Sequence, residues 1–243
     1  MDEMDDLSVG ETASEANDEV ATRPPPFYKR FVDVFFNPGR LVQALKEHPV
    51  WAVAMVVGAV LMALQFALIP PEVLAEARRQ ALLRAGQQPP PMTPRLETII
   101  RWITPVFTGL SIPVMEFIFA GLVTLLFAFI LGDEGRYRQY LAILSHAWLI
   151  PAVVEFFFLP LKIAEKNPQM TVSLGTFFFF LPEGYFLKVM NMMTLTQVWA
   201  WLVVAAGVHA INPKRRFASA AAVLIILNLL VAMIFAIFTP SMG

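Results

Sequence analysis

Five long runs of apolar residues constrain the fold of this chain more strongly than any other feature of its sequence. They cover Val50–Ile69, Ile103–Leu131, Tyr140–Leu161, Val189–Ile211 and Phe217–Phe238. At about 1.5 Å of rise per helical residue, each run is long enough to cross the roughly 30 Å hydrocarbon core of a bilayer. The runs therefore predict an all-α, polytopic membrane protein built as a bundle of five transmembrane helices.

The composition agrees with a chain that is surrounded by lipid. Hydrophobic residues make up 57% of the 243 positions and charged residues only 15%, which leaves little charge to cover a soluble domain. The sequence contains no cysteine, no phosphate-binding glycine loop and no Gly-x-Ser-x-Gly motif. We therefore expect a protein that is not an enzyme and that uses no cofactor, no metal and no nucleic acid.

The N-terminal residues 1–26 differ in character from the rest of the chain. Eight of the 19 acidic residues lie within the first 19 positions, whereas the remainder carries 18 basic and 11 acidic residues. The segment has no apolar core that would mark a signal peptide, so Val50–Ile69 is expected to be an uncleaved anchor. We predict a disordered acidic tail, which is either simply solvated or docks a protein partner.

Residues 27–49 predict two short amphipathic helices next to the membrane. Phe27, Phe31 and Phe35 recur at helical spacing among charged residues, as in a helix that lies in the interface plane. Asn37-Pro38 then reads as an N-cap followed by a proline in the first helical position, which begins a second helix over Gly39–His48. The five-span domain is expected to occupy residues 50–240.

Three connecting segments also carry a structural prediction. Pro71–Arg84 has helical character, and the short link Gly132–Gln139 makes the second and third spans antiparallel neighbours. Thr176–Leu181 contains four consecutive phenylalanines, which we expect to pack into the membrane interface or to cap the bundle.

The distribution of lysine and arginine predicts the orientation of the spans. With the N-terminus inside, ten basic residues flank the inner ends and eight flank the outer ends, and both of the shortest loops are basic. We therefore expect the N-terminus to be cytoplasmic and the C-terminus to be outside. The basic residues expected at the membrane surface are Lys29, Arg30, Arg40, Lys214, Arg215 and Arg216.

Two similar sequences place a glutamate inside an apolar run. In each, a proline precedes the glutamate by about one helical turn, as Pro113 precedes Glu116 and Pro151 precedes Glu155. Both glutamates lie about 22 Å from the inner ends of adjacent antiparallel spans, so the two carboxyls could meet at one depth. Two ionised carboxylates are disfavoured there, so one is expected to be protonated or a cation to lie between them.

Three interpretations of the two glutamates stay open. Each carboxyl could form a hydrogen bond that holds the helices in register, or the pair could bind a proton or cation. Contact with a lipid headgroup or a protein partner is the third. The prolines remove backbone hydrogen bonds and so leave carbonyl acceptors nearby.

The other ionisable residues within or beside the spans have weaker claims to a site. His146 lies on the opposite helix face from Glu155, whereas Lys162 shares its face and can extend to the outer interface. His209 lies near the inner end of the fourth span, and no His-x-x-x-His spacing indicates a metal site. The polar residues Gln65, Asn191, Gln197 and Asn228 are expected to form interhelical hydrogen bonds, and small residues such as Gly207 to mark close helix packing.

Several segments resemble bacterial members of the Ypt-interacting protein (Yip) family. They are Phe35-Phe36-Asn37-Pro38-Gly39-Arg40 before the first span, Arg136-Tyr137-Arg138-Gln139-Tyr140 before Ser145-His146-Ala147-Trp148-Leu149-Ile150-Pro151, and Thr196-Gln197-Val198-Trp199. The resemblance implies a five-span bundle with a cytosolic N-terminus, here in the bacterial inner membrane. Eukaryotic relatives bind small GTPases and act in vesicle traffic.

Two functional hypotheses follow from these features. The first is a non-enzymatic role in membrane organisation or trafficking, or as a scaffold for partners that bind the acidic tail or further copies of the chain. The second is a small ion- or proton-coupled transporter that uses Glu116 and Glu155. An intramembrane enzyme has no motif in its favour.

Overall fold

The computed structural model describes residues 24–84, 86–182 and 184–238, and the regular elements of this part are all helical. The predicted acidic tail (apart from its last three residues) and the C-terminal residues 239–243 lie outside the described residues. The helices are α2 (Phe27–Phe36), α3 (Pro38–Glu47), α4 (Ala52–Leu68), α5 (Pro71–Arg84), α6 (Pro94–Thr124), the π-helix η1 (Leu125–Ile130), α7 (Tyr137–Ala147), α8 (Leu149–Phe157), α9 (Leu159–Ala164), the 3₁₀-helix η2 (Leu174–Phe178), α10 (Tyr185–Met192), α11 (Leu195–Ile211) and α12 (Phe217–Phe238).

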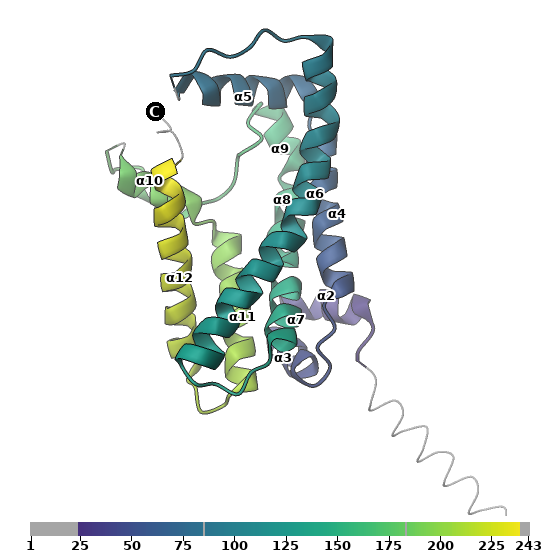
Figure 1. Ribbon diagram of the computed structural model, residues 1–243, viewed down its shortest axis with the longest axis vertical. Helices are drawn as coiled ribbons and strands as arrows, with labels where there is room; N and C mark the ends of the chain where they lie inside the picture. The colour runs from purple at the N-terminus through teal and green to yellow at the C-terminus, as the bar shows by residue number, and fades with distance from the viewer. Residues whose placement is uncertain (1–23, 85, 183, 239–243) are drawn as a thin grey trace, which may run out of the picture.

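The long helices form a bundle whose members alternate in direction (Figure 1). Helix α6 packs against α4 and α7, and α11 packs against α7 and α12. Helices α2 and α3 lie at one end of the bundle, together with the loop 131–136 and the turn 212–216. Helix α5 lies across the opposite end. The short basic loops and the amphipathic helices thus share one end, as the predicted topology requires.

The chain contains helices that are long and apolar enough to span a membrane. Within the described ranges there are three: Pro94–Ile130, Tyr137–Phe157 and Phe217–Phe238. A fourth is reached if α4 and α5 are counted as one span, although the pair bends by 91°. Helix α11 is apolar but has only 17 residues. The all-helical fold is therefore confirmed, and three or four of the described helices are long and apolar enough to cross a membrane, whereas the count of five spans stays a prediction.

The predicted continuous fourth span over Val189–Ile211 is wrong. Helix α10 ends at Met192, and α11 begins only at Leu195. Thr194 separates them because its hydroxyl accepts a hydrogen bond from the Gln197 amide at 3.2 Å, which caps the new helix. An isolated β-bridge to Ser173 holds the same residue in an extended conformation.

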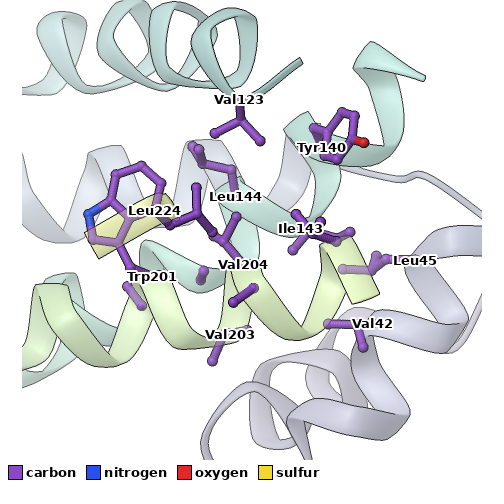
Figure 2. Packing of buried hydrophobic residues seen from close by; sticks show 14 of the residues in the cluster. Val42, Leu45, Val123, Tyr140, Ile143, Leu144, Trp201, Val203, Val204 and Leu224 are labelled. Atoms are coloured by element: carbon purple, nitrogen blue, oxygen red, sulfur yellow. The ribbon is translucent and has the colours of Figure 1, made fainter. Parts of the chain in front are cut away.

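The predicted amphipathic helices are confirmed, and both contribute to the core, α2 through Val34 and α3 through Val42 and Leu45. The Asn37 side chain accepts a hydrogen bond from the Arg40 amide, and Pro38 occupies the first turn of α3. Val42 and Leu45 of α3 point into the cluster that α7 and α11 build with Ile143 and Val204 (Figure 2). The predicted helix Pro71–Arg84 is also present, as α5.

The phenylalanine-rich segment is only partly covered by the rest of the chain. Part of it lies in the short helix η2, where Phe177 is exposed, and the following Phe179 and Phe180 are exposed as well. Phe178 packs edge-on against Phe186 of α10, with 6.3 Å between ring centroids. Exposed rings of this kind fit the predicted contact with the membrane interface.

The close approach of α7 and α11 depends on Gly207 and gives a first prediction. A methyl group at Gly207 would lie 2.6 Å from Ile143 Cδ1 and Cγ2, and the β-branched isoleucine has little freedom to move. We expect Gly207→Ala to destabilise the detergent-purified protein by about 1–3 kcal/mol in thermal unfolding. Gly121→Ala is the control, since nothing lies within 4 Å of its added methyl. Equal melting of the two variants would contradict the packing.

Candidate functional site

Glu155 forms an ion pair near the end of the bundle where α9 lies, and both of its carboxylate oxygens have a partner. Lys162 Nζ donates to one carboxylate oxygen at 2.6 Å, and the Thr171 hydroxyl donates to the other at 2.5 Å. The Lys162 side chain is only 5% exposed. The prediction that Lys162 extends to the outer interface is therefore wrong, because the buried carboxylate seven residues earlier pairs with it.

Polar residues on neighbouring elements connect this region to the bundle. The Gln65 side-chain amide donates to the backbone carbonyl of Glu155 at 3.2 Å, which joins α4 to α8. Ser173 Oγ donates to Asn191 Oδ1 at 3.1 Å and joins the loop before η2 to α10. The interhelical hydrogen bond predicted for Gln65 is confirmed, and Asn191 has a tertiary partner as well.

Glu116 has the opposite environment. Its residue is 2% exposed in the middle of α6, and neither carboxyl oxygen has a hydrogen-bond partner in the part of the chain that the structure describes. The Ser145 hydroxyl lies near this carboxyl, but the two groups do not meet the geometry of a hydrogen bond. Glu116 therefore carries a polar group that is costly to bury and that the described chain does not satisfy.

The structure does not bring the two predicted carboxyls together. Glu155 directs both oxygens to Lys162 and Thr171, whereas Glu116 directs Oε1 toward α4, where a methyl group on Gly58 would lie 4.0 Å away. The two carboxyls therefore share no hydrogen bond among the described residues, and a proton or cation held between them stays a prediction.

A cavity of about 250 Å³ lies against the unpartnered carboxyl. Its walls come from α4, α6 and the start of α8, and apart from Glu116 they are apolar. Pro151 contributes to these walls, and Pro113 lies inside α6 one turn before the glutamate. The Glu116 oxygens have almost no accessible surface, so the cavity presents an apolar surface.

His146 has a partner that the sequence did not indicate. Arg30 Nη1 lies 2.9 Å from His146 Nε2, and His146 Nδ1 lies 2.8 Å from the Ala142 carbonyl. A guanidinium can only donate, so Nε2 accepts and the protonated Nδ1 donates to the carbonyl. His146 is therefore a neutral link between α2 and α7. In the described ranges no group of three or more His, Cys, Asp or Glu could hold a metal.

Arg30 lies inside the protein, which corrects its predicted place on the membrane surface. The residue is 7% exposed, and its guanidinium also donates to the carbonyls of Pro25 at 2.9 Å and Val50 at 3.4 Å. Burial lowers the pKa of Arg30, yet an arginine that normally titrates above about 12 remains charged. Arg30 thus fastens α2 to the bundle.

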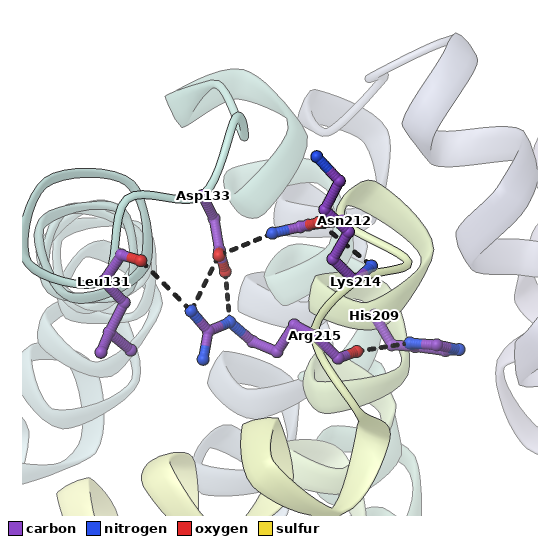
Figure 3. Close-up of polar contacts among 6 residues, drawn as sticks. All are labelled: Leu131, Asp133, His209, Asn212, Lys214 and Arg215. Atoms are coloured by element: carbon purple, nitrogen blue, oxygen red, sulfur yellow. Dashed lines mark hydrogen bonds and ion pairs between the residues drawn. The ribbon is translucent and has the colours of Figure 1, made fainter.

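A second ion pair joins the two short loops at the same end (Figure 3). Arg215 donates two hydrogen bonds to Asp133, from Nε to Oδ2 at 2.5 Å and from Nη2 to Oδ1 at 2.8 Å. The Asn212 side-chain amide also donates to Oδ1, at 2.7 Å. The guanidinium also lies 5.4 Å from the centre of the Phe127 ring. The hydrogen bonds to Asp133 raise the pKa of Arg215. Arg215 is therefore engaged within the protein. This corrects the prediction that it is a basic residue at the membrane surface.

Sequence reasoning missed Asp133, although a signal for it existed. Asp133 lies in one short loop, and the basic residues Lys214–Arg216 lie in the other. The predicted topology puts both loops on one side of the membrane, so it brings opposite charges together. His209, near the same turn, bonds the Arg215 carbonyl through Nδ1 at 2.7 Å. The remaining predicted surface cations Lys29, Arg40, Lys214 and Arg216 are exposed, and Arg40 also pairs with Asp33 at 3.0 Å.

The fold and these polar clusters define a helical protein whose longest apolar helices can span a membrane. Comparison with protein-family models, with curated proteins and with solved structures finds no match to the chain. The resemblance to the Yip family accordingly remains a prediction.

Removal of Arg215 tests the ion pair between the loops. Arg215→Ala leaves the buried Asp133 carboxylate without its main partner, so we expect a loss of about 3 kcal/mol in the free energy of unfolding. Lys214→Ala removes an exposed neighbouring cation and should change stability little. A thermal unfolding profile that is the same for both variants would refute the role of the pair.

Removal of Arg30 tests the attachment of α2. Arg30→Ala loses the bonds to His146, Pro25 and Val50, so the amides of α2 should exchange hydrogen faster while those of α11 stay protected. Lys29→Ala, at an exposed neighbouring position, is the control. Unchanged exchange in α2 after Arg30→Ala would show that the helix is held by other contacts.

Proposed function

We propose that this chain is a five-span, Yip-type protein of the bacterial inner membrane with a cytoplasmic N-terminus and an external C-terminus. Helices α4, α6 with η1, α7–α9, α11 and α12 would each cross the bilayer. Helices α4 and α11 have 17 residues each, or about 25 Å, which lies at the short end of the range for spans. Its role would be non-enzymatic, in the organisation of the membrane around the bundle.

The observation that carries this proposal is the outer face of α2. Tyr28, Val32 and Phe36 recur at intervals of four residues and are 65%, 50% and 84% exposed. The other face of the same helix buries Arg30 and Val34 against the bundle. A short helix with a packed inner face and an apolar outer face is suited to lie in the plane of the membrane interface.

Rigid attachment gives such a helix an effect on the surrounding lipid. The side chains of the outer face would occupy area in the inner leaflet alone, where packing defects and curvature make insertion easier. The exposed Lys29 of α2 would add attraction to anionic headgroups. Because Arg30 fastens α2 and the following α3 lies in the core, the inserted helix would stay fixed relative to the spans.

Curvature sorting tests the proposed role. The full-length protein, reconstituted into anionic liposomes of mixed size, should be enriched in small vesicles, and Val32→Asp with Phe36→Asp should reduce this enrichment about two-fold or more. Leu83→Asp places a charge at an exposed position of α5, at the other end of the bundle, and should leave the sorting unchanged. Equal sorting by wild type and the α2 variant would overturn the proposal.

The alternative of transport through coupled carboxyls has less support, because Glu155 is already paired. Glu155→Gln leaves the buried Lys162 ammonium without its partner, so we expect a loss of about 3 kcal/mol in stability with no change in proton or cation flux across proteoliposomes. The double variant Glu155→Gln with Lys162→Met should recover part of that stability. A specific loss of flux in a folded Glu155→Gln protein would favour the transporter instead.

A further inference from the structure

A basic cavity lies between the two short loops, at the end of the bundle where α2 and α3 also lie. Its volume is about 470 Å³, which is ample for a small ligand or a lipid headgroup. The loop 131–136, the turn 212–216 and the start of α12 form its walls, and the lining includes Gly132, Asp133, Asn212, Lys214, Arg216 and Ser219. We call this space the loop cavity.

The charges that line the loop cavity leave it positive. Asp133 contributes a carboxylate, but both of its oxygens accept hydrogen bonds from Arg215 or Asn212, and its side chain is 2% exposed. Lys214 and Arg216 are exposed, and no ion pair among the described residues engages either of them. Two accessible cations beside a carboxylate that is already neutralised attract an anion.

The contacts between the loops hold these donors in place before a ligand arrives. Asn212 accepts a hydrogen bond from the Lys214 amide at 3.2 Å and donates one to Asp133, so the turn is fixed to the opposite loop. Ser219 is exposed in the first turn of α12, where the helix dipole also favours negative charge. An anion would therefore bind to groups that lose little conformational freedom.

We propose that the loop cavity binds the phosphate group of an anionic phospholipid. Lys214 and Arg216 would donate to the phosphate oxygens, as basic pockets at the cytoplasmic ends of membrane helices do. In the proposed arrangement this end of the bundle lies at the inner membrane surface, where anionic headgroups are found, and the site depends on that placement.

Apolar side chains beside the loop cavity favour a lipid over a soluble phosphate. Leu131 lines the cavity and is 39% exposed, and Phe217, which follows Arg216 in the chain, is 43% exposed. A phospholipid whose headgroup occupies the cavity can cover these side chains with its acyl chains, which a soluble phosphate cannot do.

Binding of a phosphatidylglycerol with a fluorescent acyl chain to the full-length protein in uncharged detergent tests the site, with fluorescence anisotropy as the readout. Wild type should bind this lipid saturably, and more tightly than a phosphatidylcholine with the same acyl chains. Lys214→Gln with Arg216→Gln should weaken the binding of phosphatidylglycerol about ten-fold or more. Unlabelled phosphatidylglycerol should displace the probe, whereas inorganic phosphate and glycerophosphate at the same concentration should not.

Arg136→Gln with Arg138→Gln is the control that is matched in charge. Both arginines are exposed at the same end of the bundle, and neither lines the loop cavity. This variant loses as much positive charge and should bind phosphatidylglycerol as wild type does. Equal weakening by the two double variants would show a general attraction to the basic end of the bundle and would overturn the site.

Ser219→Asp keeps the test decisive if Lys214→Gln with Arg216→Gln does not fold. An aspartate in the first turn of α12 suits the helix dipole, so the fold is retained, while its charge repels a phosphate. Unchanged binding by Ser219→Asp, equal binding of the two lipids, or no saturable binding to wild type would overturn the site. Displacement of the probe by inorganic phosphate or glycerophosphate would overturn the lipid as its ligand. Anisotropy in detergent does not measure vesicle sorting, so a failure of this site is distinguishable from a failure of the role proposed for α2.

Discussion

The cost of leaving a polar group unpaired among apolar helices is the constraint on which this structure depends. Three clusters of polar side chains avoid this cost by pairing their members. They are Arg30 with His146, Glu155 with Lys162 and Thr171, and Asp133 with Arg215 and Asn212. Each cluster joins segments that are not continuous in one helix, so it specifies which elements lie together as well as satisfying charge. The apolar surface alone could pack in many ways, whereas these partners select one arrangement of the ends.

The parts of the fold that the sequence predicted are those set by local rules. Apolar run length gives the long helices, the Asn37-Pro38 pair gives the start of α3, and the composition of Pro71–Arg84 gives α5. The missed features depend on partners distant in sequence. Thr194 interrupts an apolar run because it caps α11, and Arg30 looks like a surface cation until His146 is placed beside it. Sequence spacing put the two intramembrane glutamates at one depth, but it could not show that Lys162 would pair with one of them.

Glu116 has no hydrogen-bond partner among the described residues, whereas Glu155 has two. The engaged clusters fix the bundle, and Arg30 fixes α2 at its end with an apolar face outward. These features support a protein that acts on the surrounding membrane by its shape.

The proposed arrangement in the membrane depends on five crossings, above all those of the short helices α4 and α11. The absence of native cysteine allows single cysteines to be placed at Gly39, Gln80, Gln169 and Lys214, which are all exposed, and labelled with a membrane-impermeant maleimide. We expect Gln80→Cys and Gln169→Cys to react on intact spheroplasts, whereas Gly39→Cys and Lys214→Cys should react only after the inner face of the membrane is made accessible. Labelling of Gly39→Cys and Gln80→Cys from one side would show that α4 does not cross. Labelling of Gln169→Cys and Lys214→Cys from one side would show the same for α11, and either result would contradict the five-span arrangement.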